Sequence, residues 1–170
     1  HKKVNQISDF LKSTAEKYDL KYKAFNREES IKEGLGAFVA VNQGSSQEAS
    51  FTILEYNCGK ADAKTFGLVG KCVLFDTGGI SIKPSDNMHY MKSDMGGASA
   101  VIGALITASE LKLPVNIIAI LPITDNAVSE NAYLPSDVVT AYNGKTIEVL
   151  NTDAEGRMTL ADGLSYLSKN

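Results

Sequence analysis

The sequence predicts an α/β domain with helices on both faces of a sheet. Segments with helical spacing of apolar residues alternate along the chain with short apolar segments of strand length. Residues 115–121 (VNIIAIL) are almost continuously apolar, which is typical of a central strand covered on both faces. The chain has 170 residues, 44% of them hydrophobic, and this length and composition fit one domain with a single core.

Apolar residues that recur at steps of three and four predict the helices. The first covers residues 1–20, and the charged stretch 26–33 (NREESIKE) predicts a short surface helix. The clearest helix begins at Gly96, has its apolar residues on one face and is ended by Pro114. The same spacing predicts a final helix over residues 159–167.

Short apolar segments predict the strands. Residues 37–42 (AFVAVN) form the first predicted strand, and residues 51–56 (FTILEY) form a second, paired with the first or close to it. Residues 66–75 predict either one buried strand or two short ones. Together with the run 115–121, these segments make up the predicted sheet.

A hairpin is predicted near the end of the chain. Residues 137–141 and 146–150 are strand-like, and the turn dipeptide Asn143–Gly144 joins them. Residues 80–94 and 124–136 are polar or without a clear period, so we expect loops there.

Composition limits the classes of function. The formal net charge is −3, which gives no reason to expect nucleic acid or an anionic membrane as the main partner. No apolar run approaches the roughly 18–20 residues that a membrane-spanning helix needs. Two cysteines, Cys58 and Cys72, cannot build a disulfide framework, so we expect a reducing cytoplasm. The start at His1 predicts that the natural N-terminus is absent and that His1 is a tag residue.

Carboxylates follow two of the predicted strands. Asp76 comes directly after an apolar run and before two glycines, and Asp153 and Glu155 follow the strand-like residues 146–150. Residues two apart on an extended chain point to the same side, so Asp153 and Glu155 face one point, and Arg157 continues the alternation. Ligands of open α/β sheets bind beyond the carboxyl ends of the strands. The alternative is that Asp153 caps the final helix and Glu155 is solvated.

Other charged residues also have structural explanations that need no functional site. Asp94 precedes two glycines and a predicted helix, where it is a good capping residue. Lys83 and Lys92 are solvated on the simplest interpretation, and His89 lies in a loop. Lys71 differs because it interrupts an apolar stretch (LVGKCVLF), where an ammonium group is unfavourable unless it is paired or neutral.

Four sequence blocks carry a resemblance, and they are residues 69–79 (VGKCVLFDTGG), 80–84 (ISIKP), 91–98 (MKSDMGGA) and 151–157 (NTDAEGR). In their order and separation they resemble the signature blocks of the leucyl aminopeptidase family of cytosolic metallopeptidases. The resemblance implies a three-layer α/β/α sandwich with a mixed, largely parallel central sheet, similar to zinc exopeptidases. It also implies that residues 1–170 are the N-terminal part of the catalytic domain, without the family's N-terminal domain and C-terminal remainder.

The resemblance implies a centre of two divalent metal ions. Lys71 and Asp94 match ligands of one metal, Asp76 matches an aspartate shared between the metals, Asp153 matches a ligand of the other metal, and Glu155 matches a bridging carboxylate. The four carboxylates carry −4 and two divalent ions carry +4, so the charges balance only if Lys71 binds as a neutral amine. Oxygen ligands and one amine suit Zn²⁺ or Mn²⁺, and also Mg²⁺ or Co²⁺.

The same resemblance implies roles for three further residues. Lys83 matches the lysine that polarises the substrate carbonyl, and Arg157 matches the arginine that holds a bicarbonate ion as proton shuttle. Met91 matches a residue that lines the pocket for the first side chain of the substrate.

The implied function is aminopeptidase activity. The full-length protein is expected to release N-terminal leucine and other apolar residues from peptides, as a cytoplasmic hexamer without membrane or nucleic-acid partners. The chain as given is expected to be inactive. One alternative is a catalytically silent fragment or relative with a structural or DNA-associated role. Another is a nucleotide-binding α/β domain, which rests on the glycines alone.

Overall fold

The computed structural model describes residues 2–170, and His1, with its predicted tag origin, lies outside the described residues. In chain order, the elements are α1 (Val4–Lys17), β1 (Lys21–Phe25), α2 (Arg27–Glu33), α3 (Gly36–Asn42), β2 (Ser50–Tyr56), β3 (Thr65–Val69), β4 (Cys72–Asp76), the 3₁₀-helix η1 (Met88–Ser93), α4 (Gly96–Glu110), β5 (Asn116–Asn126), β6 (Val138–Thr140), β7 (Thr146–Glu148), the 3₁₀-helix η2 (Thr152–Ala154) and α5 (Glu155–Lys169).

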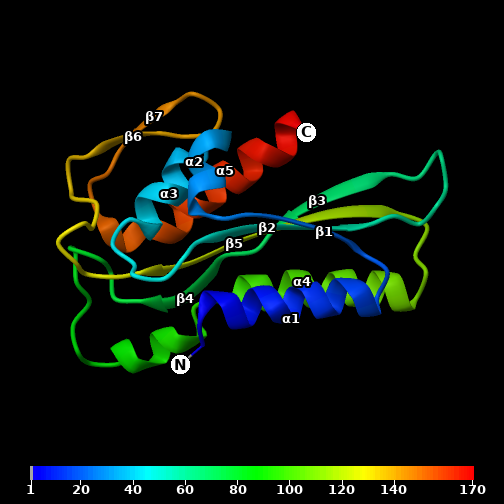
Figure 1. The fold of residues 1–170 in the computed structure, drawn as a ribbon, viewed down its shortest axis with the longest axis horizontal. Coiled ribbons are helices and arrows are strands. Elements are labelled where there is room, and N and C mark those ends of the chain that lie inside the picture. Colours follow the sequence, from blue (N-terminus) through cyan, green and yellow to red (C-terminus); the bar gives the residue numbers. More distant parts are fainter. Residues whose placement is uncertain (1) are drawn as a thin grey trace.

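The elements form three layers, which confirms the predicted fold class. A five-stranded mixed sheet lies between α1 and α4 on one face and α2, α3 and α5 on the other (Figure 1). A separate two-stranded sheet of β6 and β7 lies beside the second helical layer. This arrangement covers both faces of the central strand β5, whose residues are almost all buried, as its apolar sequence predicts.

Strand β5 is the centre of the sheet. It pairs antiparallel with β2 on one side and parallel with β3 and then β4 on the other, while β1 pairs antiparallel with β2 at the edge. The pairing with β3 ends at Ile120, and the pairing with β4 begins at Ile123. Pro122, which has no N–H to donate, therefore lies in the gap between the two parallel partners.

Each helical layer encloses its own part of the core. On one face, Leu11 of α1 and Leu105 of α4 pack with β-strand residues such as Leu121. On the other face, the rings of Phe38, Phe51 and Tyr166 form edge-to-face contacts, with centroids 5.5 Å and 5.6 Å apart. Tyr166 belongs to α5, so this aromatic cluster fixes the final helix on the sheet.

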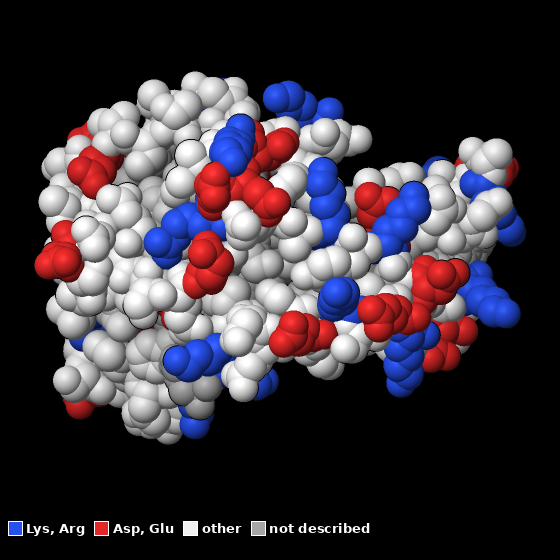
Figure 2. Space-filling model, in the orientation of Figure 1, with Lys and Arg blue, Asp and Glu red and all other residues white. Residues whose placement is uncertain are grey.

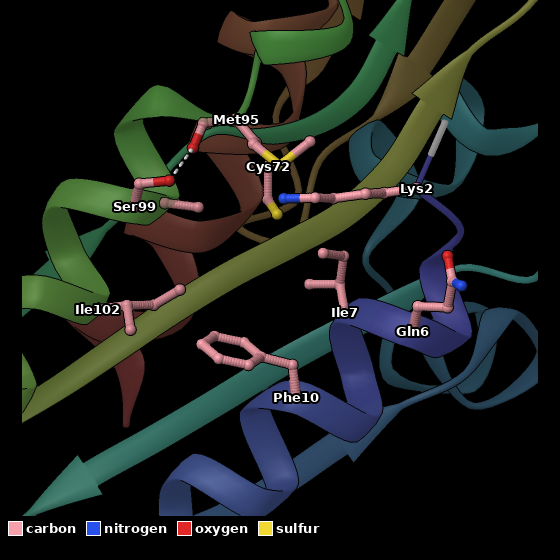
Figure 3. A pocket seen from close by; sticks show the side chains of 9 residues that line it. Lys2, Gln6, Ile7, Phe10, Cys72, Met95, Ser99 and Ile102 are labelled. Atoms are coloured by element: carbon pink, nitrogen blue, oxygen red, sulfur yellow. Dashed lines mark hydrogen bonds between the residues drawn. The ribbon is translucent and has the colours of Figure 1, made fainter.

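A hollow of about 390 Å³ remains between α1 and α4 (Figure 3). Ile7 and Phe10 of α1 lie on one side of it, Met95 and Ile102 lie on the other, and Cys72 of β4 forms part of its lining. The two helices therefore leave an apolar depression above the first residue of β4.

Several local predictions were wrong. Residues 37–42 form helix α3, not a strand, and β2 therefore pairs with β1 and β5. Helix α3 is buried along most of its length, so its sequence lacks the polar face that gives a helical period. Residues 21–25, to which no element was assigned, form the edge strand β1. The loop expected from residue 124 begins later, because β5 continues to Asn126.

The surface carries mixed charge. Figure 2 shows acidic and basic side chains interspersed over one face of the molecule. Within residues 2–170, no helix combines the length and the apolar character that crossing a bilayer requires.

Candidate functional site

The site lies where β4 and β5 end and α5 begins. Asp76 is the last residue of β4, Asp153 lies on η2, and Glu155 is the first residue of α5. One carboxylate oxygen from each of these three residues lies within 4.8 Å of the others. Asp76 and Glu155 are buried, with 2% and 1% of their surface exposed, whereas Asp153 is exposed. Acidic residues from two segments, the end of β4 and the start of α5 with η2 before it, thus converge on one point.

Lys71 joins this cluster from the connection between β3 and β4. Its Nζ atom lies 2.5 Å from Asp94 Oδ2 and 2.7 Å from Glu155 Oε1. The Lys71 carbonyl accepts a hydrogen bond from Ala98 N, so the backbone is fixed to the start of α4. Gly156 leaves room for the side chain, because a Cβ atom there would lie 2.9 Å from Lys71 Cδ.

A second ammonium group, that of Lys83, enters from the loop after β4. Lys83 Nζ lies 2.9 Å from Asp76 Oδ2 and also pairs with Asp153 Oδ1. Thr152 anchors this loop, since its hydroxyl donates to the Gly78 carbonyl (2.6 Å) and accepts from Ser81 N (2.8 Å). The loop and η2 are therefore held together, and with them Lys83 and Asp153.

Burial and ion pairing shift the pKa values of these groups in opposite directions. Desolvation lowers the pKa of Lys71, but the ion pairs with Asp94 and Glu155 outweigh it and leave the pKa raised. The pKa of Lys83 is raised in the same way, by Asp153 and Asp76 against desolvation. Desolvation raises the pKa of Asp94 and of Glu155. The geometry of the chain alone therefore favours a charged Lys71, and a neutral amine there requires another cation among the carboxylates.

The donor set fits divalent cations. Asp76, Asp94, Asp153 and Glu155 supply up to four negative charges, against two positive charges from Lys71 and Lys83. Carboxylate oxygens with one amine nitrogen are ligands for Zn²⁺, Mn²⁺, Mg²⁺ or Co²⁺. The surplus of negative charge around buried oxygen atoms is an arrangement that bound cations would compensate.

Two expected residues are less closely involved. Arg157, on the first turn of α5, lines a hollow of about 280 Å³ together with Lys71, Asp153 and Glu155. Its side chain is exposed and forms no ion pair within the part of the chain that is described. Met91 lies on η1, and its carbonyl accepts a hydrogen bond from Asp94 N at 3.2 Å. Met91 thus adjoins Asp94 through the backbone.

The capping alternatives do not hold. Met95, not Asp94, precedes α4 as its N-cap, and no side-chain hydrogen bond caps that helix. The final helix begins at Glu155, before the expected start at residue 159. Its N-cap is Ala154, without a side-chain hydrogen bond, so Asp153 does not cap it, and Glu155 is buried and not solvated. The extended alternation expected for Asp153 and Glu155 was also wrong, since η2 and α5 contain them.

Sequence reasoning missed three residues at the site. Asn126 donates to Asp76 Oδ1 (2.8 Å), Thr152 holds the Lys83 loop, and Tyr133 donates from its buried hydroxyl to the Thr152 carbonyl (2.8 Å). Burial, with the charges of Glu155 and Asp76, raises the pKa of Tyr133, which keeps this donor protonated. Asn126 could have been identified from its place after the apolar run of the central strand, because ligands of open α/β sheets bind beyond the carboxyl ends of the strands.

Comparison with known proteins identifies a matching family and similar structures. The sequence profile of the catalytic domain of the cytosol aminopeptidase family matches residues 2–170. The apo structure of leucyl aminopeptidase from Trypanosoma cruzi is similar with a TM-score of 0.94 and 34% sequence identity, over 98% of this chain and 32% of that chain. Leucine aminopeptidase from Caenorhabditis elegans gives a TM-score of 0.92 and 33% identity, over 97% of this chain and 34% of that chain. The chain thus spans about a third of each protein.

Proposed function

The chain belongs to the cytosol aminopeptidase family, and from this premise we propose that the protein containing it is a metal-dependent aminopeptidase. The observation that carries the proposal is the convergence of Asp76, Asp153 and Glu155, with oxygen atoms within 4.8 Å of one another. The substrates are peptides with a free N-terminus, with a preference for leucine and other apolar residues. The resemblance of the sequence blocks supports this preference.

Five residues would hold two divalent ions, either Zn²⁺ or Mn²⁺ with Mg²⁺ or Co²⁺ as further candidates. They are Lys71, Asp76, Asp94, Asp153 and Glu155. When bound, such ions polarise a carbonyl group and lower the pKa of a water molecule, which is the chemistry of peptide hydrolysis. Burial of Asp76 and Glu155 keeps their carboxylates fixed and away from competing water.

Two basic residues would complete the reaction. Lys83 Nζ, next to Asp76 and Asp153, presents positive charge where negative charge develops on the carbonyl oxygen during attack. Arg157, at the hollow lined by Lys71 and Glu155, would hold bicarbonate as the group that moves the proton. Met91, next to Asp94, would line the pocket for the first side chain of the substrate.

The test uses two variants of the full-length protein, Asp76→Ala and Glu155→Ala. Each removes a central carboxylate, so we expect nearly complete loss of leucine p-nitroanilide hydrolysis and loss of tight metal binding in calorimetry. Asp62→Ala, at an exposed carboxylate far from these contacts, is the matched control and should retain both. Normal turnover by either site variant would refute the proposed centre.

We further propose that residues 1–170 are the first part of a larger catalytic domain, because they span only about a third of the similar structures. Residues 1–170 alone would then be catalytically silent, while the full-length enzyme would be a cytoplasmic hexamer. Activity assays on residues 1–170 and on the full-length protein test the first point, and sedimentation of the full-length protein tests the second. Turnover by the short chain or a monomeric full-length enzyme would contradict it.

A further inference from the structure

Asn126 is a buried residue that contacts the carboxylates and has no part in the reaction described above. It ends β5 and is the direct Cα partner of Asp76, which ends β4. Its Nδ2 atom lies 2.8 Å from Asp76 Oδ1, 3.0 Å from the Thr152 carbonyl and 3.4 Å from Glu155 Oε2. Only 1% of the residue is exposed. One amide group therefore faces three acceptors from β4, η2 and α5.

The surroundings fix the orientation of this amide. Turning it over would place Oδ1 against the carboxylates of Asp76 and Glu155, where two acceptors repel each other. In the observed orientation, Oδ1 has no hydrogen-bond partner among the described residues. It lies against Gly79, where a Cβ atom would come within 2.9 Å of it. Asn126 is thus placed to donate toward the site.

The backbone of Asn126 strengthens this arrangement. Its carbonyl accepts hydrogen bonds from Thr77 N (3.0 Å) and from Thr77 Oγ1 (2.9 Å). The residue therefore holds both the side chain of Asp76 and the first residue of the loop that carries Lys83. Asp76 Oδ1 is fixed by Asn126 and by Gly78 N, which leaves Oδ2 toward Lys83.

We propose that Asn126 is a positioning residue, whose side-chain amide holds Asp76 and Glu155 at the separation and orientation that metal binding requires. This inference rests on the proposed function. A carboxylate that is free to rotate loses part of its affinity for a cation, and hydrogen-bond donors behind the ligands prevent that rotation. The two lysines bind the same carboxylates from the open side, whereas Asn126 binds them from the buried end of the sheet.

The experiment compares three variants of the full-length protein. Asn126→Ala removes the donor, and Asn126→Asp keeps the shape but places an acceptor against Asp76 Oδ1. Asn42→Ala is the matched control, since Asn42 is also fully buried and donates from Nδ2 to Thr124 Oγ1 (3.0 Å) on the same strand. Asn42 contacts none of the four carboxylates, so its loss affects folding alone.

Metal-free protein is titrated with Mn²⁺ by calorimetry and with Co²⁺ by visible absorption, at a temperature where all variants are folded. We expect Mn²⁺ affinity to fall about 10- to 100-fold in both Asn126 variants, together with altered Co²⁺ bands. Asn42→Ala should lower the melting temperature and leave affinity and bands unchanged.

Wild-type affinity in either Asn126 variant, or an equal loss of affinity in Asn42→Ala, would overturn the role of Asn126. Asp76→Ala is titrated in parallel to separate this result from failure of the metal centre. If Asp76→Ala loses tight binding while Asn126→Ala retains it, the inference about Asn126 is wrong and the proposed function stands. If Asp76→Ala retains tight binding, the proposed function is wrong.

Discussion

Glu155 Oε1 lies 2.7 Å from Lys71 Nζ, and the residue after Glu155 is a glycine, which leaves space beside the same lysine. A Cβ atom at Gly156 would come within 2.9 Å of Lys71 Cδ and 3.0 Å of Cε. The first turn of α5 therefore supplies both the carboxylate that holds the ammonium and the space through which the lysine side chain passes.

Gly156→Ala should weaken metal binding with little effect on folding. The added methyl group meets the flexible end of Lys71, which can move, so the backbone stays in place while Nζ is displaced from Glu155 and Asp94. Calorimetric metal titration and thermal melting of the full-length protein measure the two effects. Gly103→Ala is the control, because Gly103 lies in α4 and a Cβ atom added there would meet nothing within 4 Å, and it should stabilise by about 0.5–1 kcal/mol. Equal metal affinity in both variants would show that Lys71 does not need this space.

Lys71→Met should destabilise the metal-free protein by about 2–4 kcal/mol, because Glu155 is buried and loses its ammonium partner. We expect a destabilisation near the lower end of that range, because 28% of the Lys71 side chain is exposed and solvent weakens the ion pair. Adding Glu155→Gln removes the unpaired charge, and the double variant should recover much of the lost stability. Urea unfolding of the four proteins in the cycle measures the coupling. Additive losses would mean that the two groups do not interact energetically.

The residues that meet at the site were easier to predict than the local structure that brings them together. The sequence blocks identified Asp76, Asp153 and Glu155, and the structure brings these three together. The local reason offered for Asp153 and Glu155 was wrong, because the segment is helical and not extended. Tertiary hydrogen bonds from Thr152 to Gly78 and Ser81 hold η2 at the site, and such non-local contacts leave no periodic pattern in the sequence.

Contacts between residues that are distant in sequence also explain the errors in the predicted secondary structure. The run 37–42 is apolar on all sides because α3 is enclosed by neighbouring elements, and a short apolar run fits a helix as well as a strand. The polar end of β5 looked like a loop, yet Asn126 is held in the sheet by pairing with Asp76. In both cases a partner that is distant in sequence decides the local conformation.

Thr152→Val should destabilise the protein by about 2 kcal/mol and lower kcat in the full-length enzyme. Valine keeps the shape of threonine but leaves the Ser81 N–H without its acceptor and the Gly78 carbonyl without its donor. The loop that carries Lys83 then loses two of the hydrogen bonds that anchor it. Urea unfolding and steady-state kinetics measure the two effects. Thr107→Val, at an exposed helical hydroxyl bonded only to Gly103 O, serves as control and should change stability by less than about 0.5 kcal/mol.

The two cysteines should differ in reactivity although both are free thiols. Cys72 is 2% exposed, and burial raises the pKa of its thiol to about 12, while Cys58 is partly exposed. At mildly alkaline pH, iodoacetamide should therefore label Cys58 in the folded protein and Cys72 only after unfolding, as peptide mass spectrometry would show. Equal labelling of both sites in the folded protein would contradict this.

The raised pKa of Cys72 also sets the sign of a stability change with pH. The unfolded chain loses the thiol proton near the ordinary value of 9.0, before the folded chain does, so the stabilising contribution is complete below pH 9.0 and is lost as pH rises toward about 12. Within that window, wild-type stability should fall relative to Cys72→Ala by about 1.4 kcal/mol per pH unit. Urea unfolding of both proteins at a series of pH values measures the difference, and Cys58→Ala controls for the loss of a thiol. A constant difference between wild type and Cys72→Ala would mean that the Cys72 thiol is no harder to ionise in the folded chain than in the unfolded one.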